Sequence, residues 1–258
     1  MPVCYKNFPV TVGGVNIYAN SASLNEDLTI ETAESYGIKG SRAVFNTQIP
    51  KGSLTIDSYV KESVSPFLAL AGDNDQQLAV TFGKYTLPTP AILTSMSINV
   101  AVGSPVTLSM TIDYFGTATT GSTPAPASPT HTPLNVEGVT LNGFDQIGGS
   151  NNIQSVDFSF SQSYEEHTLL GQVGAAPIII FSQGTMALDI SSPDMTIGLV
   201  EEDKSCVIAP KSYSVSLSGC GGLDYGLINM PLGYMQTRST SIDPSSPPSS
   251  SVSIIQYL

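Results

Sequence analysis

The sequence has few of the residues that carry chemistry: no tryptophan, three cysteines and two histidines. Cys4, Cys206 and Cys220 lack the CxxC spacing of zinc and redox motifs, so we interpret them as reduced thiols of a protein made in a cytoplasm. His131 lies among prolines and threonines, and His167 follows two glutamates. We therefore expect solvated turn histidines rather than ligands of a metal or members of a catalytic triad.

Basic residues are also scarce. Nine lysines and arginines face 21 aspartates and glutamates, which gives a formal net charge of −12. A surface of this charge repels phosphate backbones, because affinity for nucleic acids comes largely from lysine and arginine contacts. Basic residues interleaved with aromatic ones, which would stack single strands, are missing too. Nucleic-acid binding is thus excluded as the main function.

Long apolar runs and catalytic motifs are absent. The run Ala175–Phe181 is far shorter than a membrane span, and the N-terminus does not have the pattern of a signal peptide. Ser58–Lys61 matches the S-x-x-K of serine acylases without its companion motifs. Gly72–Gln77 contains two aspartates but lacks the glycine and distal glutamate of a calcium loop. The sequence predicts a protein that is not an enzyme and has no cofactor or metal.

What the chain does have is alternation of polar and apolar residues. Serine and threonine alternate with valine, isoleucine, leucine and phenylalanine, as expected for strands with one solvated face. The predicted strands include residues 53–58, 95–102, 106–114, 155–164, 212–219 and 251–258. We predict an all-β fold of antiparallel sheets.

Three segments interrupt this pattern. Residues 58–70 have helical spacing, but Pro66 lies in the middle, so we expect one or two short helices. Residues 116–134 contain four prolines and no apolar periodicity, which is typical of a connector. Residues 243–251 are rich in serine and proline and predict a long loop. The expected organisation is a first domain over 1–116, a connector over 117–133 and a second domain over 134–258.

One pattern occurs twice. "KGSLTIDS" (residues 51–58) and "QGTMALDIS" (residues 183–191) share glycine, a hydroxyl residue, alternating aliphatic residues and aspartate. A strand and an acidic turn precede each copy, with Glu31 and Glu34 in the first and Glu165 and Glu166 in the second. Downstream, we match the strand pair in residues 92–114 with residues 212–234. Serine-rich strands resemble each other by chance, but we favour a duplication.

The paired segments carry a resemblance to a known family. "IQSVDFSFSQSYEEHTLLGQ" (residues 153–172) is similar to the first strand and acidic turn of bacteriophage tail tube proteins, and "GSLTIDSY" and "GTMALDIS" are similar to their second strand. The chain resembles the subgroup whose subunit carries two tandem tube domains. The resemblance implies two antiparallel β-sandwich or half-barrel domains.

The resemblance also implies a function. Such subunits self-assemble into stacked rings that form the tail tube of a long-tailed phage, and three duplicated subunits would form a homotrimeric, pseudo-sixfold ring. DNA would pass through an acidic conduit without specific binding. The implied partners are a tape-measure protein and tail terminator or tip proteins, and the implied location is the virion, after assembly in the host bacterial cytoplasm.

Two further expectations concern surfaces. The irregular segment over residues 60–86 predicts a ring-to-ring or subunit contact, with Phe67, Leu68, Leu70, Asp73 and Asp75 as candidate residues; the alternative is a helix and loop packed on their own domain. The alternative function is another β-sandwich virion or surface module, namely a head–tail adaptor, a decoration protein or a carbohydrate-binding protein.

Overall fold

The computed structural model describes residues 9–27, 30–34, 42–46, 49–72, 77–121, 133–144, 153–167, 177–193, 209–219, 223–243 and 246–258. The predicted all-β fold is confirmed, because nearly every described element is a strand and the large sheets are antiparallel. Asp73, Asp75, His131 and the three cysteines lie outside the described residues.

The strands of the first half are β1 (Val10–Val12), β2 (Val15–Ile17), β3 (Ala19–Asp27), β4 (Ile30–Glu34), β5 (Arg42–Asn46), β6 (Lys51–Tyr59), β7 (Val80–Phe82), β8 (Tyr85–Thr86), β9 (Ala91–Ala101), β10 (Thr107–Phe115) and β11 (Thr119–Thr120). Those of the second half are β12 (Gly138–Asn142), β13 (Ser155–Ser161), β14 (Tyr164–His167), β15 (Ile178–Phe181), β16 (Thr185–Ser192), β17 (Lys211–Ser218), β18 (Asp224–Asp243) and β19 (Ser246–Tyr257).

One ten-stranded antiparallel sheet runs through both halves in the order β12-β17-β18-β19-β16-β13-β9-β10-β6-β3. Within it, the first half contributes β3-β6-β10-β9 and the second half β13-β16-β19-β18. If the four strands of each half are numbered along the chain, both halves have the order 1-2-4-3. A two-stranded hairpin, β4–β5 or β14–β15, lies between strands 1 and 2 in each case. The two halves therefore share one topology.

This order corrects our matching of the downstream strand pairs. Residues 92–114, which form β9 and β10, correspond to β18 and β19 rather than to residues 212–234. The match was wrong because β17 and the first part of β18 have the same alternation of polar and apolar residues as the central strands of the sheet. The acidic segments before the two copies are strands of hairpins, not turns.

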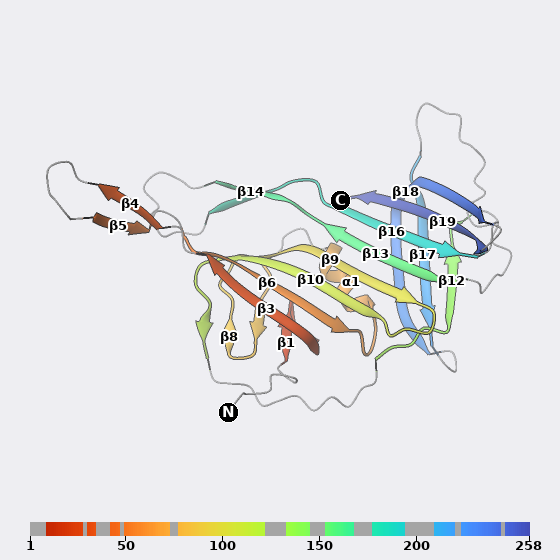
Figure 1. The fold of residues 1–258 in the computed structure, drawn as a ribbon, viewed down its shortest axis with the longest axis horizontal. Helices are drawn as coiled ribbons and strands as arrows, with labels where there is room; N and C mark the ends of the chain where they lie inside the picture. The colour runs from red at the N-terminus through yellow and green to blue at the C-terminus, as the bar shows by residue number, and fades with distance from the viewer. Residues whose placement is uncertain are drawn as a thin grey trace.

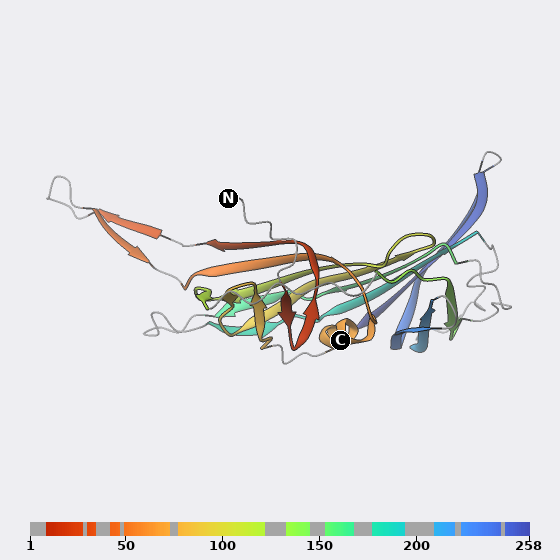
Figure 2. The same cartoon turned by 90° about the horizontal axis from the view of Figure 1, so that it is seen from below.

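The core lies on one face of the long sheet and is continuous between the halves. The sheet β11-β8-β7-β1-β2 and helix α1 (Ser65–Gly72) lie over this face, and Figure 2 shows them on one side of the long strands. The first part of β18 turns away with β17 and β12, which run across the direction of β13 and β16 in Figure 1. Tyr213, Val215 and Ile228 of these strands are buried in the same core.

Helix α1 begins later than predicted. Residues 58 and 59 belong to β6, and the helix starts at Ser65 with Pro66 in its first turn. Proline is tolerated there because the amide hydrogens of the first turn have no partner within the helix. Pro66 thus starts the helix instead of interrupting it. In the described part of the chain, no helix has the length and apolarity that crossing a membrane requires.

Two predicted irregular segments contain strands. The connector begins with β11, which pairs with β8, and near its other end the amide of Leu134 donates to the carbonyl of Val60. The serine-rich segment before the last strand was predicted as a loop, yet β19 already starts at Ser246 and pairs with β18. Between Ser239 and Ser241 this ladder joins serine and threonine residues to serines.

The repeated glycines have matched surroundings. The ring of Tyr114 lies over Gly52, its directly opposite residue on β10, and its hydroxyl donates to Glu26 of β3 at 3.1 Å. In the second half, Leu258 lies beside Gly184, and Gln162 is the next side chain along. A side chain on one strand thus covers a glycine on the next at the same place in both halves, which explains the glycine in "KGSLTIDS".

These glycines differ in how much room they have. A Cβ at Gly52 would lie 2.2 Å from Cζ of Tyr114, whereas one at Gly184 would lie 3.3 Å from Cδ1 of Leu258. We predict that Gly52→Ala lowers the free energy of unfolding by about 1–3 kcal/mol through overpacking. The matched control Gly184→Ala changes it by about 0.5 kcal/mol or less. Urea unfolding measures both, and equal effects would contradict the packing described here.

Candidate assembly interface

The face of the long sheet opposite the core is polar. Cross-strand register places hydroxyl, amide and carboxylate side chains there on seven neighbouring strands, all of them half-buried or exposed. We call it the open face; its central residues are Ser21, Ser23, Ser53, Thr55, Asp57, Ser109, Thr111, Ser97, Asn99, Asp157, Ser159, Thr185, Asp189 and Ser253. Among the described side chains of these seven strands, the one basic residue on this face is Lys51, at its end.

Aspartates on the open face are held by hydrogen bonds rather than by cations. Asp57 accepts from Ser21 at 2.9 Å and from Ser109 at 2.8 Å, which ties three strands together. Asp157 accepts from Asn99 across the junction of the halves. Asp189 lies directly opposite Asp157, an arrangement of like charges that destabilises a sheet. The acidity of this face therefore has a cost in stability and calls for another explanation.

Besides the outer edge of β12, which pairs only with β17, the long sheet has two free edges among its described strands. β3 pairs with β6 on one side and with no other described strand. In β18, residues 224–233 pair with β17, whereas residues 234–243 pair with β19 alone. Both edges carry unpaired backbone amides and carbonyls, which are a template for pairing with another chain.

Inside the chain, the corresponding edges are joined. In the order of the sheet, the last strand of the first half is β9 and the first strand of the second half is β13. These two strands pair from Ala101↔Ser155 to Ser95↔Ser161. The two free edges belong to the first strand of the first half and the last strand of the second half. The free edge of β3 thus corresponds to the edge of β13 that pairs with β9, and the free edge of β18 corresponds to the edge of β9 that pairs with β13.

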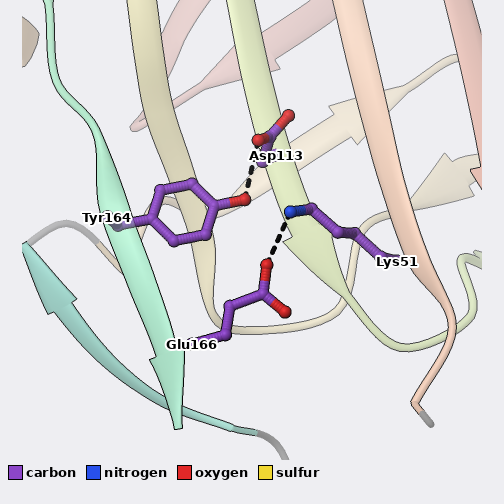
Figure 3. Close-up of polar contacts among 4 residues, drawn as sticks. All are labelled: Lys51, Asp113, Tyr164 and Glu166. Atoms are coloured by element: carbon purple, nitrogen blue, oxygen red, sulfur yellow. Dashed lines mark hydrogen bonds and ion pairs between the residues drawn. The ribbon is translucent and has the colours of Figure 1, made fainter.

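A second contact crosses the junction at the end of the open face. β14 brings Tyr164 and Glu166 of the second half over Lys51 and Asp113 of the first half (Figure 3). The hydroxyl of Tyr164 donates to Asp113 at 2.8 Å, and the ammonium of Lys51 lies 2.6 Å from Glu166. We call these four residues the junction clamp.

Aromatic packing completes the junction clamp. The rings of Phe115 and Tyr164 meet edge to face with centroids 5.8 Å apart, and the ammonium of Lys51 lies 4.9 Å from the centre of the Tyr164 ring. Lys51 and Glu166 are both more than one-third exposed, so their ion pair adds little stability. The buried Phe115 and the Tyr164 hydrogen bond account for most of the clamp's strength.

Burial of Tyr164 has an electrostatic consequence. Desolvation, together with the hydrogen bond to the Asp113 carboxylate, raises the pKa of Tyr164 to about 12 even though Lys51 acts in the opposite direction. For Lys51, burial acts to lower its pKa, but hydrogen bonds to Glu166 and Tyr164 outweigh it and raise the pKa above its usual value. Lys51 therefore keeps its positive charge and Tyr164 keeps its hydroxyl proton throughout the neutral range.

Three of the residues predicted as subunit contacts, Phe67, Leu68 and Leu70, lie on helix α1, and Asp73 and Asp75 lie outside the described residues. Phe67 and Leu70 of α1 are buried in the core and Leu68 packs against it, which agrees with the alternative of a helix packed on its own domain. The helix packs on its own chain, where the amide of Val64 donates to the carbonyl of Tyr225. The apolar residues of this helix therefore contribute to the core.

Other candidate sites have structural roles in the described part of the chain. The hydroxyl of Ser58, from the S-x-x-K match, is buried and donates to the carbonyl of Tyr18, and Lys61 lies over the Tyr18 ring. They line a cavity of about 200 Å³ beside Phe67. His167 is exposed near Glu165. No group of three His, Cys, Asp or Glu suited to a metal occurs among the described residues.

Sequence reasoning predicted strands with one solvated face, but it missed the free edges and the clamp. The open face was visible in the alternation, because its residues are the serines and aspartates between the core residues of each predicted strand. The edges and the clamp had no local signal, since strand order brings Lys51 and Glu166 together across 115 residues.

We predict that Tyr164 titrates late. Its folded pKa is above the unfolded value of about 10, so its contribution to stability is complete below pH 10 and is lost as the pH rises through about 12. The difference between the tyrosinate absorbance curves of the wild type and Tyr164→Phe isolates this group, with far-ultraviolet circular dichroism as the control for folding. A midpoint near 10 in folded protein would contradict the clamp geometry.

Comparison with known proteins assigns no family. No protein-family model matches the chain, and no curated protein matches it. The function is therefore argued from the geometry of the long sheet.

Proposed function

We propose that this chain is a structural subunit that assembles head to tail into rings, and that stacked rings form the tail tube of a long-tailed bacteriophage. Three copies, each with two matched halves, make a homotrimeric ring with pseudo-sixfold symmetry. The proposal requires no catalytic centre.

The observation that carries the proposal is the repeat of strand order with two complementary free edges. The sheet reads β3-β6-β10-β9 and then β13-β16-β19-β18, so each half presents the same first and last strand. When the last strand of one half pairs with the first strand of the next inside the chain, the same rule applied between chains pairs β18 with β3 of a second copy. Contacts of this head-to-tail kind close into rings or propagate as filaments.

The open face supports a channel. A sheet closed into a ring turns one face inward, and the core layer with its covering strands occupies the other face. The inward face would be the open face, with its hydroxyl groups and with Asp57, Asp157 and Asp189. Such a wall does not grip a DNA duplex, because grip comes from basic side chains that displace counterions.

The hairpins support stacking of rings. In Figure 1, β4–β5 extends beyond the ends of β3 and β6, and β14 extends from the corresponding end of β13. On β15, which pairs with β14, Ile178 and Ile180 are half-exposed. Exposed aliphatic residues on a projecting hairpin are typical of a protein–protein contact. A tape-measure protein inside the tube and terminator or tip proteins at its ends complete the proposal.

A cysteine pair tests the head-to-tail contact. Ser239 holds the place of Asn99, because Ser239 pairs with Ser251 and Asn99 pairs with the matching Thr107. Ser21 holds the place of Asp157, because Ser21 pairs with Asp57 and Asp157 pairs with the matching Asp189. Asn99 lies opposite Asp157 at the internal junction, so Ser239 is expected opposite Ser21 of the next copy. We predict that mixing Ser239→Cys and Ser21→Cys proteins, with the native cysteines replaced by serine, gives a disulfide-linked dimer under mild oxidation.

The controls separate this register from other contacts. Each variant alone should stay largely monomeric in denaturing gels, and Thr140→Cys on the outer strand β12 should not link to Ser21→Cys. Electron microscopy of the uncrosslinked wild type should show rings or tubes. Absence of assemblies across salt and concentration would count against the proposed function, and a Thr140 crosslink would assign the contact to a different edge.

A further inference from the structure

An apolar patch interrupts the open face at the end of the second half. Tyr234, Ile255 and Tyr257 lie there on neighbouring strands, because Tyr234 pairs with Ile255 and Tyr257 follows two residues later on the same face. The rings of Tyr234 and Tyr257 are 6.4 Å apart, and Tyr257 is 48% exposed. We call these three residues the tyrosine patch.

In the first half, the residues that correspond to the tyrosine patch are covered by another segment of the chain. Ser95, Thr111 and Asp113 match Tyr234, Ile255 and Tyr257, since Tyr114 and Leu258 hold matched positions over Gly52 and Gly184. In the first half the chain that leaves β13 crosses this place, and Tyr164 reaches Asp113 there. In the second half no described element covers it.

We propose that the tyrosine patch is a docking surface for a second copy of this chain, which places on it the segment that leaves β3. The inference rests on the proposed function and extends it. When β3 of the next copy pairs with residues 234–243 of β18, its Asp27 end emerges beside Tyr234, as the end of β13 emerges beside Ser95.

The chemistry of the two places differs. Within the chain, the crossing segment is held by a tyrosine–carboxylate hydrogen bond and an ion pair. The tyrosine patch offers two aromatic rings and an isoleucine, with neither lysine nor aspartate at the positions that match Lys51 and Asp113, which are Gln183 and Tyr257. The contact between copies is therefore apolar, and exposed aromatic residues of this kind contribute much of the binding energy in interfaces.

The test changes Tyr257, because replacing a side chain this exposed leaves the fold intact. Tyr257→Ser should raise the concentration needed for assembly, measured by sedimentation and electron microscopy, by about tenfold or more. Tyr257→Phe should assemble as the wild type does, because the contact uses the ring and not the hydroxyl. Ile255→Thr, which installs the residue of the first half, should also weaken assembly. Leu227→Ser is the matched control, being 46% exposed but paired with β17 and away from the patch.

The outcomes distinguish the proposals. If the wild type assembles and Tyr257→Ser and Ile255→Thr assemble equally well, the docking surface is overturned while the tube remains. If the wild type forms no assembly, the proposed function fails first. Binding of Tyr257 to specific glycans on an array, lost in Tyr257→Ser without any change in oligomeric state, would overturn docking of a second copy in favour of a carbohydrate platform.

Discussion

The backbone ladder between β9 and β13 is the constraint on which the rest of the molecule depends. It joins two four-stranded units of the same order edge to edge, so that the core, the open face and the spacing of both hairpins continue from one unit to the next. Antiparallel pairing also keeps the strand directions in phase, because each unit begins with a strand that runs the same way. The two units thus share one continuous sheet and one continuous core.

A sheet built from a row of repeated units has an unpaired strand edge at each end. Each junction satisfies one first-strand edge and one last-strand edge, and any finite open row of units leaves one of each unpaired. The chain leaves the edges of β3 and of residues 234–243 of β18 in this state, and β3 carries neither the proline nor the lysine with which many proteins protect an edge. Closure into a ring removes both edges without any new kind of contact.

Features that depend on residues close together in the chain could be predicted from the sequence, whereas features that depend on tertiary packing could not. Alternation in residues such as Leu54, Ile56 and Asp57 predicted strands and their faces, because period-two patterning depends on the chain's own neighbours. The echo at Gly184 predicted a duplication, and the strand orders match. The strand pair β9 and β10 was matched with residues 212–234 of the second half instead of with β18 and β19, because strand order is set by tertiary packing, which similar serine-rich strands do not encode. The sequence left open whether Phe67 and Leu70 face a core or a partner, since an apolar helix looks alike in both cases.

The two halves are not equivalent in chemistry, and the difference has a physical use. The internal junction is fastened by Lys51, Asp113 and Tyr164, whereas the matching end of the second half presents tyrosines and an isoleucine. If both places accepted the same segment, β13 of one chain could replace β3 of another on the free edge, and strands would exchange between copies. A polar clamp at one place and an apolar patch at the other penalise that exchange, because Tyr164 and Glu166 would lose the carboxylate and the ammonium that receive them. In the proposed ring, alternating chemistry along the repeating sheet favours contact between the first unit of one copy and the second unit of its neighbour.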